Sequence, residues 1–101
     1  MKRGTVWELS LADATRTVLV LSIDEANDSY RAAVCLLLHP SGAYPDTLLS
    51  VPIEDPVRAV AVPVNLTQYA AHRFEHAKPL GRIPPETMER VERAVRSVLD
   101  L

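Results

Sequence analysis

The chain has 101 residues, of which 48% are hydrophobic and 24% charged, and this composition excludes a disordered chain. A length of this order predicts a single domain that spans residues 1–101. The formal net charge of −2 excludes a protein that coats nucleic acid by bulk charge, although a local basic patch stays compatible with it. Because there is one cysteine and no apolar run near the roughly 20 residues that span a bilayer, we expect a cytoplasmic protein without disulfides or membrane segments.

The first part of the chain predicts β-strands. Residues 4–11 alternate as in a half-exposed strand, whereas residues 17–23 and 30–39 are continuous apolar runs, typical of strands covered on both faces. The polar residues 24–29 predict a turn between these two runs. A turn there makes the two buried strands antiparallel, so the end of the second should lie near the start of the first.

Prolines bound the elements that follow. Residues 40–46 predict a loop, and residues 47–53 and 59–66 predict further strands, each with a proline that suits a sheet edge or a bend. Residues 72–78 mix basic and aromatic side chains and predict a surface loop.

The carboxyl end predicts an amphipathic helix. Pro84 and Pro85 open it, because a proline in the first turn lacks only an N–H group that would be unpaired anyway. Four apolar residues at helical spacing form its buried stripe: Met88, Val91, Val95 and Val98. Three Glu–Arg pairs, four residues apart, predict a solvated face rather than a helix that reads nucleic acid: Glu86–Arg90, Glu89–Arg93 and Glu92–Arg96.

Several short motifs follow one another in an order and spacing that resemble the MazF/PemK toxins over nearly the whole chain. They are residues 2–7 (KRGTVW), 16–22 (RTVLVLS), Asn27, 64–67 (VNLT), 80–84 (LGRIP), Met88 and 98–101 (VLDL). The resemblance implies a mainly β fold with α, a small SH3-like β-barrel of the MazF/CcdB type with a C-terminal helix. It also implies a homodimer that cleaves single-stranded RNA without a metal or another cofactor, and that a cognate antitoxin protein holds inactive.

RNA cleavage without a metal requires particular groups. The 2′-hydroxyl attacks the adjacent phosphorus, so the site needs a base, an acid for the leaving 5′-oxygen and a cation for the phosphoryl oxygens. Arginine suits the last role, because its planar fork donates two parallel hydrogen bonds and keeps its charge. Arg16 stands at the head of the second strand, where the family has a catalytic arginine, so the resemblance implies that role. From the residue alone, an arginine in water at a strand end is the alternative.

A catalytic hydroxyl, usually a threonine, ends the third strand in the family, and His39 stands at that position here. Histidine exchanges protons near neutral pH. We therefore predict that Arg16 and His39 form a catalytic pair that leaves 2′,3′-cyclic phosphate ends. Two other features depart from the family: Thr17 replaces a proline, and only residues 12–15 connect the first two strands.

An RNA-binding surface is predicted beside the pair, with Tyr69 or Phe74 stacking on a base. Its residues are Ser22, Asn27, Ser41, Tyr69, His72, Arg73, Phe74, His76 and Lys78. A surface loop of this composition needs no ligand, which is the alternative. His72 and His76 have the spacing of metal ligands, but no third ligand is grouped with them, so we predict no metal site. Cys35, inside an apolar run, predicts a small core residue.

Two classes of function stay open. One is a type II toxin that acts as an endoribonuclease, and it predicts basic residues around Arg16 and His39. The other is a non-catalytic module of the same fold, a degenerate toxin that binds an antitoxin or a protein target such as gyrase. It predicts an apolar, poorly charged groove at the same place. An antitoxin should dock as an apolar, acidic segment, partly through Arg16 and residues 72–78.

Overall fold

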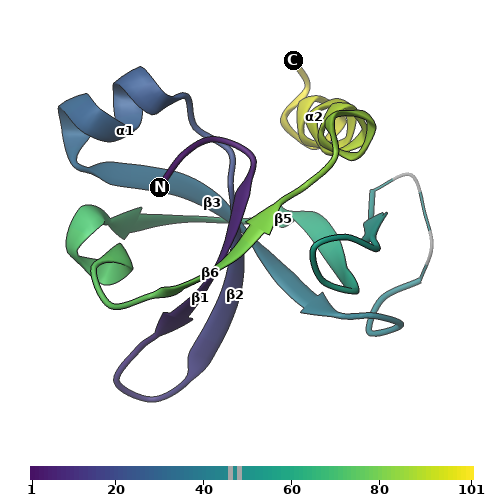
Figure 1. Cartoon of the computed structure of the whole chain (residues 1–101). Helices are drawn as coiled ribbons and strands as arrows, with labels where there is room; N and C mark the ends of the chain where they lie inside the picture. The colour runs from purple at the N-terminus through teal and green to yellow at the C-terminus, as the bar shows by residue number, and fades with distance from the viewer. Residues whose placement is uncertain (46, 48) are drawn as a thin grey trace.

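Six strands form one curled antiparallel sheet, in the order β4-β5-β3-β2-β1-β6, in the computed structural model of the protein (Figure 1). The structure describes residues 1–45, 47 and 49–101. The expected mainly β fold with a C-terminal helix is confirmed. The elements are β1 (Thr5–Ser10), β2 (Thr15–Val20), α1 (Asp24–Tyr30), β3 (Ala32–Pro40), β4 (Val51–Ile53), β5 (Ala59–Ala70), the 3-10 helix η1 (Ala71–Phe74), β6 (Lys78–Arg82) and α2 (Pro85–Leu99).

The sheet buries an apolar cluster on each face, because successive residues of its central strands point to opposite sides. Leu19 of β2 and Leu36 of β3 pack with Met88 and Val91 of α2 in the first cluster. The second cluster lies on the opposite face and contains Leu9, Val18, Val20, Ala33, Cys35 and Phe74. Two covered faces explain why β2 and β3 appear as continuous apolar runs in the sequence.

The segment 24–29 lies within helix α1 (Asp24–Tyr30), so the predicted turn is wrong. Helix α1 has Asp24 and Glu25 in its first turn, where carboxylates favour the helix dipole, and it ends at Arg31 in a left-handed conformation. Asn27 anchors it: the amide Nδ2 donates to the carbonyl oxygens of Met1 at 3.0 Å and Ser22 at 3.2 Å. A polar helix this short has no apolar stripe, so its sequence resembles that of a turn.

The strands after the loop differ from the prediction in length. Only Val51–Ile53 of the predicted strand 47–53 is a strand, at the edge of the sheet, where Pro52 is tolerated. Ser50 is buried just before it, and its hydroxyl donates to the carbonyl of Pro45 at 2.6 Å. The predicted loop 40–46 is irregular over residues 41–45, whereas Pro40 ends β3. Asp46 and Leu48 lie outside the described residues.

Strand β5 is longer than predicted, and its pairing with β3 is interrupted. Leu36 lies opposite Leu66, but Leu38 lies opposite Ala61, so β5 carries extra residues between the two paired stretches. Pro63 lies in this interruption, where its missing N–H breaks no ladder bond. Asn65 lies there too.

The predicted surface loop 72–78 is wrong at both ends, because it overlaps η1 and the start of β6. Strand β6 pairs with β1, and Lys78 lies opposite Glu8. Gly81 in β6 has φ 132°, and a Cβ there would lie 2.9 Å from Cβ of Pro56. A strand with Pro79 and this glycine has little β propensity of its own, so it forms through pairing.

Helix α2 confirms the predicted helix; of the predicted stripe Met88 and Val91 are buried and Val95 and Val98 are half-buried, and Ala94 completes the buried face. In the described part of the chain none of the three predicted Glu–Arg pairs lies within ion-pair distance. Glu92 instead accepts a hydrogen bond from Nη2 of Arg3 at 2.8 Å, which ties α2 to the amino terminus. Among the described residues, neither helix has the length and hydropathy needed to cross a membrane.

Candidate functional site

Strands β2 and β3 bring Arg16 and His39 to one rim of the sheet. Thr17 lies opposite Leu38 in their antiparallel register, so the next residues outward are Arg16 and His39. Residues two apart along a strand share a face, so Arg16 lies on the face of Val18 in the second cluster. His39 shares that face, because Cys35 belongs to the same cluster. The predicted antiparallel arrangement of the two strands is therefore confirmed.

The His39 ring is held by two neighbours. Its Nε2 lies 2.7 Å from the amide Nδ2 of Asn65, which comes from the interruption in β5. The Tyr44 ring packs edge-on against the imidazole, with ring centroids 4.9 Å apart and an interplanar angle of 61°. The side chain of His39 is half-buried by these contacts and keeps its position at the end of β3.

The Arg16 side chain is exposed, and within the described residues no carboxylate pairs with it. The charge of Arg16 affects the pKa of Tyr69, which lies opposite Ala33 in the register of β5 and β3. Burial raises the pKa of the Tyr69 phenol, and the charge of Arg16 opposes that rise. Tyr69 packs on the second cluster, so the phenol and the guanidinium lie on the same face of the sheet.

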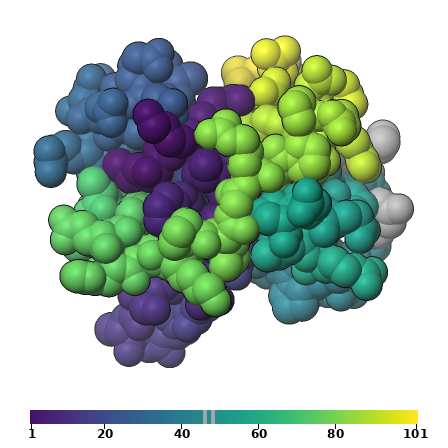
Figure 2. Space-filling view, viewed as in Figure 1, coloured from purple at the N-terminus to yellow at the C-terminus, as the bar shows by residue number. Residues whose placement is uncertain are grey.

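A hollow of about 510 Å³ opens beside Tyr69. Its walls come from the β1–β2 connection and from the corner between β5 and η1, namely Leu11, Ala12, Asp13, Gln68, Tyr69, Ala70, His72 and Arg73. The β1–β2 connection protrudes at the bottom of the molecule in the orientation of Figure 2. Tyr69, His72 and Arg73 thus share this hollow with the acidic Asp13, and neither Arg16 nor His39 is among its lining residues.

The remaining predicted residues of the segment after β5 lie in different surroundings. Phe74 is buried, and its ring packs edge-on against Trp7 at a centroid distance of 5.5 Å. It caps the second cluster, so its ring does not offer a face to a base. His76, Lys78 and also Ser41, which follows β3 closely, are exposed.

Ser22 and Asn27 lie away from Arg16, at the other end of β2. Extended chain rises about 3.3 Å per residue, so Ser22 lies on the order of 20 Å from Arg16. Asn27 is 1% exposed, and the Ser22 hydroxyl bonds to its Oδ1 and accepts from the backbone N–H of Val34. Both side chains are occupied in joining α1, β3 and the amino terminus.

Asn65 is the site residue that sequence reasoning missed. It occurs in one of the quoted motifs, but nothing in the spacing links it to His39, 26 positions earlier. The available signal was Pro63, because a proline inside a strand marks a bulge or bend that can re-aim the side chains that follow.

No group of three or more metal-ligating side chains occurs in residues 1–45, 47 and 49–101, and this range includes His72 and His76. The thiol of Cys35 is buried, and burial raises its pKa to about 12. Such a thiol stays protonated and unreactive at neutral pH, which agrees with the predicted core role.

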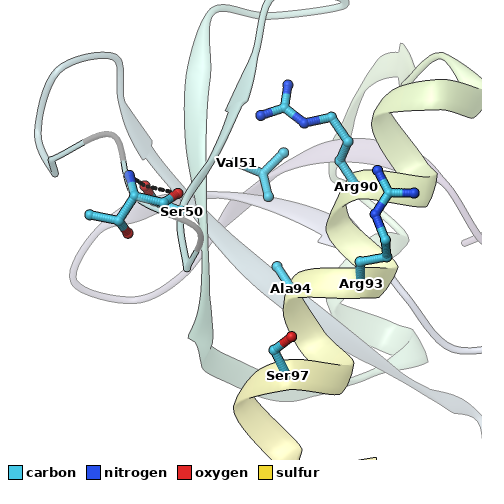
Figure 3. Close-up of a pocket in the computed structure, with 7 residues that line it drawn as sticks. Ser50, Val51, Arg90, Arg93, Ala94 and Ser97 are labelled. Atoms are coloured by element: carbon cyan, nitrogen blue, oxygen red, sulfur yellow. Dashed lines mark hydrogen bonds between the residues drawn. The ribbon is translucent and has the colours of Figure 1, made fainter.

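A second hollow of about 590 Å³ lies on the face covered by α2 (Figure 3). Val51 of β4 and Ala94 of α2 lie between the strand and the helix. Arg90 and Arg93 extend from α2 along the rim of the hollow. None of the site residues predicted from the sequence lines it, and it faces away from Arg16 and His39.

Comparisons with known proteins agree with this arrangement. The family profile of the PemK-like, MazF-like toxins of type II toxin–antitoxin systems matches residues 2–99. Curated protein sequences give no match. An endoribonuclease from a Mycobacterial species, solved in complex with its cognate antitoxin, has 20% identity and a TM-score of 0.87, over 100% of this chain and 96% of that chain.

Two other solved structures have the same fold. A chain of the MazE–MazF crystal structure from Deinococcus radiodurans gives 18% identity and a TM-score of 0.83, over 100% of this chain and 96% of its own. The Mycobacterium tuberculosis toxin MazF-mt6 gives 13% identity and a TM-score of 0.74, over 95% of this chain and 97% of its own. At these identities the likeness establishes the fold.

Proposed function

The chain belongs to the PemK-like, MazF-like toxins of type II toxin–antitoxin systems, and we propose that it is a metal-independent endoribonuclease that cleaves single-stranded RNA. One observation carries the proposal: Arg16 and His39 adjoin at one rim of the sheet, on one face. A guanidinium with no carboxylate partner among the described residues, beside an imidazole, supplies the cation and the proton-transfer group that this cleavage requires.

The reaction follows from these two groups. The 2′-oxygen forms a bond to the adjacent phosphorus while the bond from phosphorus to the 5′-oxygen breaks. The proton lost by the 2′-hydroxyl is balanced by one that the leaving oxygen gains, and the products are a 2′,3′-cyclic phosphate and a 5′-hydroxyl. Arg16 stabilises charge on the phosphoryl oxygens with two parallel N–H groups, and His39 assists proton transfer.

RNA binding on the face of the sheet that carries Arg16 is supported by the hollow at Tyr69. The half-buried phenol ring offers a surface for base stacking, and Arg73 supplies positive charge for the RNA backbone.

We also propose a homodimer and an antitoxin partner for this chain. Large apolar side chains remain exposed, including Tyr30 at 80%, Val64 at 64% and Ile23 at 54%. A second copy or an apolar, acidic segment of an antitoxin would cover such surface. Sedimentation at micromolar concentration should give a dimer, and a monomer would reject the first of these proposals.

The test of the enzyme is incubation of the pure protein with a long single-stranded RNA, with and without chelator. Cleavage should persist in chelator and leave 2′,3′-cyclic phosphate ends. The His39→Ala variant should lose about 10²–10⁴ in rate, the usual contribution of a positioned acid–base group. If the wild type cleaves no long RNA, the enzyme is excluded and the non-catalytic module that binds an antitoxin replaces it.

A further inference from the structure

We propose that Asn65 is a positioning residue for His39. Its amide holds Nε2 of the imidazole and leaves Nδ1 as the nitrogen that contacts the RNA. The catalytic consequence rests on the ribonuclease activity proposed above. The hydrogen bond itself is testable without RNA, so the two can fail separately.

The geometry of the contact assigns the ring proton. The amide nitrogen Nδ2 of Asn65 lies 2.7 Å from Nε2 of His39. With the amide in this orientation its NH₂ group donates, so Nε2 accepts through its lone pair. A neutral imidazole has one proton, and this bond therefore places it on Nδ1. In the described part of the protein, Nδ1 has no hydrogen-bond partner.

The position of Asn65 is set by the interruption in β5. The register passes from Leu36 opposite Leu66 to Leu38 opposite Ala61, and Asn65 lies among the extra residues of β5. A bulge of this kind re-aims a side chain that a regular strand would direct elsewhere. The Tyr44 ring packs edge-on against the imidazole, with ring centroids 4.9 Å apart. His39 is therefore contacted both at Nε2 and by an aromatic ring.

The consequence for catalysis is a defined working nitrogen. The neutral ring presents the N–H group of Nδ1, a hydrogen-bond donor, to the negative oxygens of a bound phosphodiester. The proton transfer of the proposed function belongs to the charged ring, whose Nδ1–H protonates the leaving 5′-oxygen. When the ring is charged, Asn65 can turn its amide so that Oδ1 accepts from Nε2–H. Nδ1 is then the free nitrogen in both charge states.

Long-range ¹H–¹⁵N spectra of protein labelled at histidine test the hydrogen bond at a pH where the rings are neutral. The wild-type His39 ring should be protonated at Nδ1. In Asn65→Asp the carboxylate only accepts, so the proton should move to Nε2, and in Asn65→Leu both forms should appear. His72 and His76 are internal controls, His39→Ala assigns the signals, and Val64→Ala should leave the pattern unchanged.

A wild-type ring protonated at Nε2, or a pattern that persists in both Asn65 variants, would overturn the proposal. Cleavage assays test its consequence: Asn65→Leu should lower kcat by about 10²-fold with KM little changed, because the ring is misplaced. Wild-type kcat in a folded Asn65→Leu protein would overturn the positioning role. If the wild type cleaves no RNA, the proposed function fails, while the spectra still decide the hydrogen bond.

Discussion

The two ends of strand β2 use polar side chains in opposite ways. Near its carboxyl end, Asn27 is 1% exposed and bonds to Met1 and Ser22, so its polar atoms are satisfied inside the protein. Near its amino end, Arg16 is exposed, and His39 is hydrogen-bonded at one ring nitrogen. Both ends carry polar residues that sequence reasoning assigned to RNA. The difference teaches that a buried polar group whose hydrogen bonds are all made stabilises the fold. A polar group at the rim that still has an unused donor or acceptor is available to a ligand.

Replacing Arg16 should produce the largest effect at the amino end. We expect Arg16→Ala to lose about 10²–10³ in the rate of RNA cleavage, because one preorganised donor to the phosphoryl oxygens is removed. Arg16→Lys should recover little of this loss, since a point charge does not reproduce the fork. Initial rates on a long RNA measure both variants.

Arg58→Ala is the matched control, because Arg58 is an exposed arginine that pairs with Glu54 at 3.4 Å. It should cleave RNA at the wild-type rate. A full recovery in Arg16→Lys, or an equal loss in Arg58→Ala, would mean that bulk positive charge rather than a bidentate contact matters at Arg16.

Replacing Asn27 should affect stability and not chemistry. Asn27→Ala leaves the Ser22 hydroxyl and the Met1 carbonyl without their partner, and the free energy of unfolding should fall by about 1–3 kcal/mol. Urea unfolding measures this change, with Asp28→Ala on the exposed side of α1 as control. A folded Asn27→Ala protein that has lost RNA cleavage would return Asn27 to the active site.

Cys35, between the two ends, gives an effect that appears only at alkaline pH. Burial raises the pKa of its thiol from the usual 9.0 to about 12, so between these values the unfolded chain releases a proton that the folded chain keeps. The free energy of unfolding should therefore fall as pH rises from 9 to 12, by up to about 1.4 kcal/mol per pH unit. Denaturant titrations of wild type and Cys35→Ala across this range isolate the thiol, and identical slopes would contradict the assignment.

Much of the frame of the site could be predicted because it depends on local patterns. The apolar runs of β2 and β3 are long enough to identify strands, and the connection between them is too short for the crossover that a parallel pair requires. That arrangement alone brings Arg16 and His39 to the same rim. The helix α2 was predictable for the same reason, since its stripe and its opening prolines lie within a single segment.

The features that escaped prediction depend on distant partners. Helix α1 forms around an Asn27 side chain whose acceptor is the carbonyl of Met1, 26 positions away. Strand β6 exists through pairing with β1. Phe74 is buried because η1 folds its ring onto Trp7, and composition alone made it resemble an exposed, base-stacking residue.

The central claim is that Arg16 and His39 act together on one phosphodiester, and a double-mutant cycle tests it most directly. Cleavage rates are measured for wild type, Arg16→Ala, His39→Ala and the double variant on one RNA in chelator. Residues that act as a unit are grossly non-additive, so the double variant should be about as slow as the slower single variant. Losses that multiply would contradict the account, as would a cycle in which either single variant cleaves RNA at the wild-type rate.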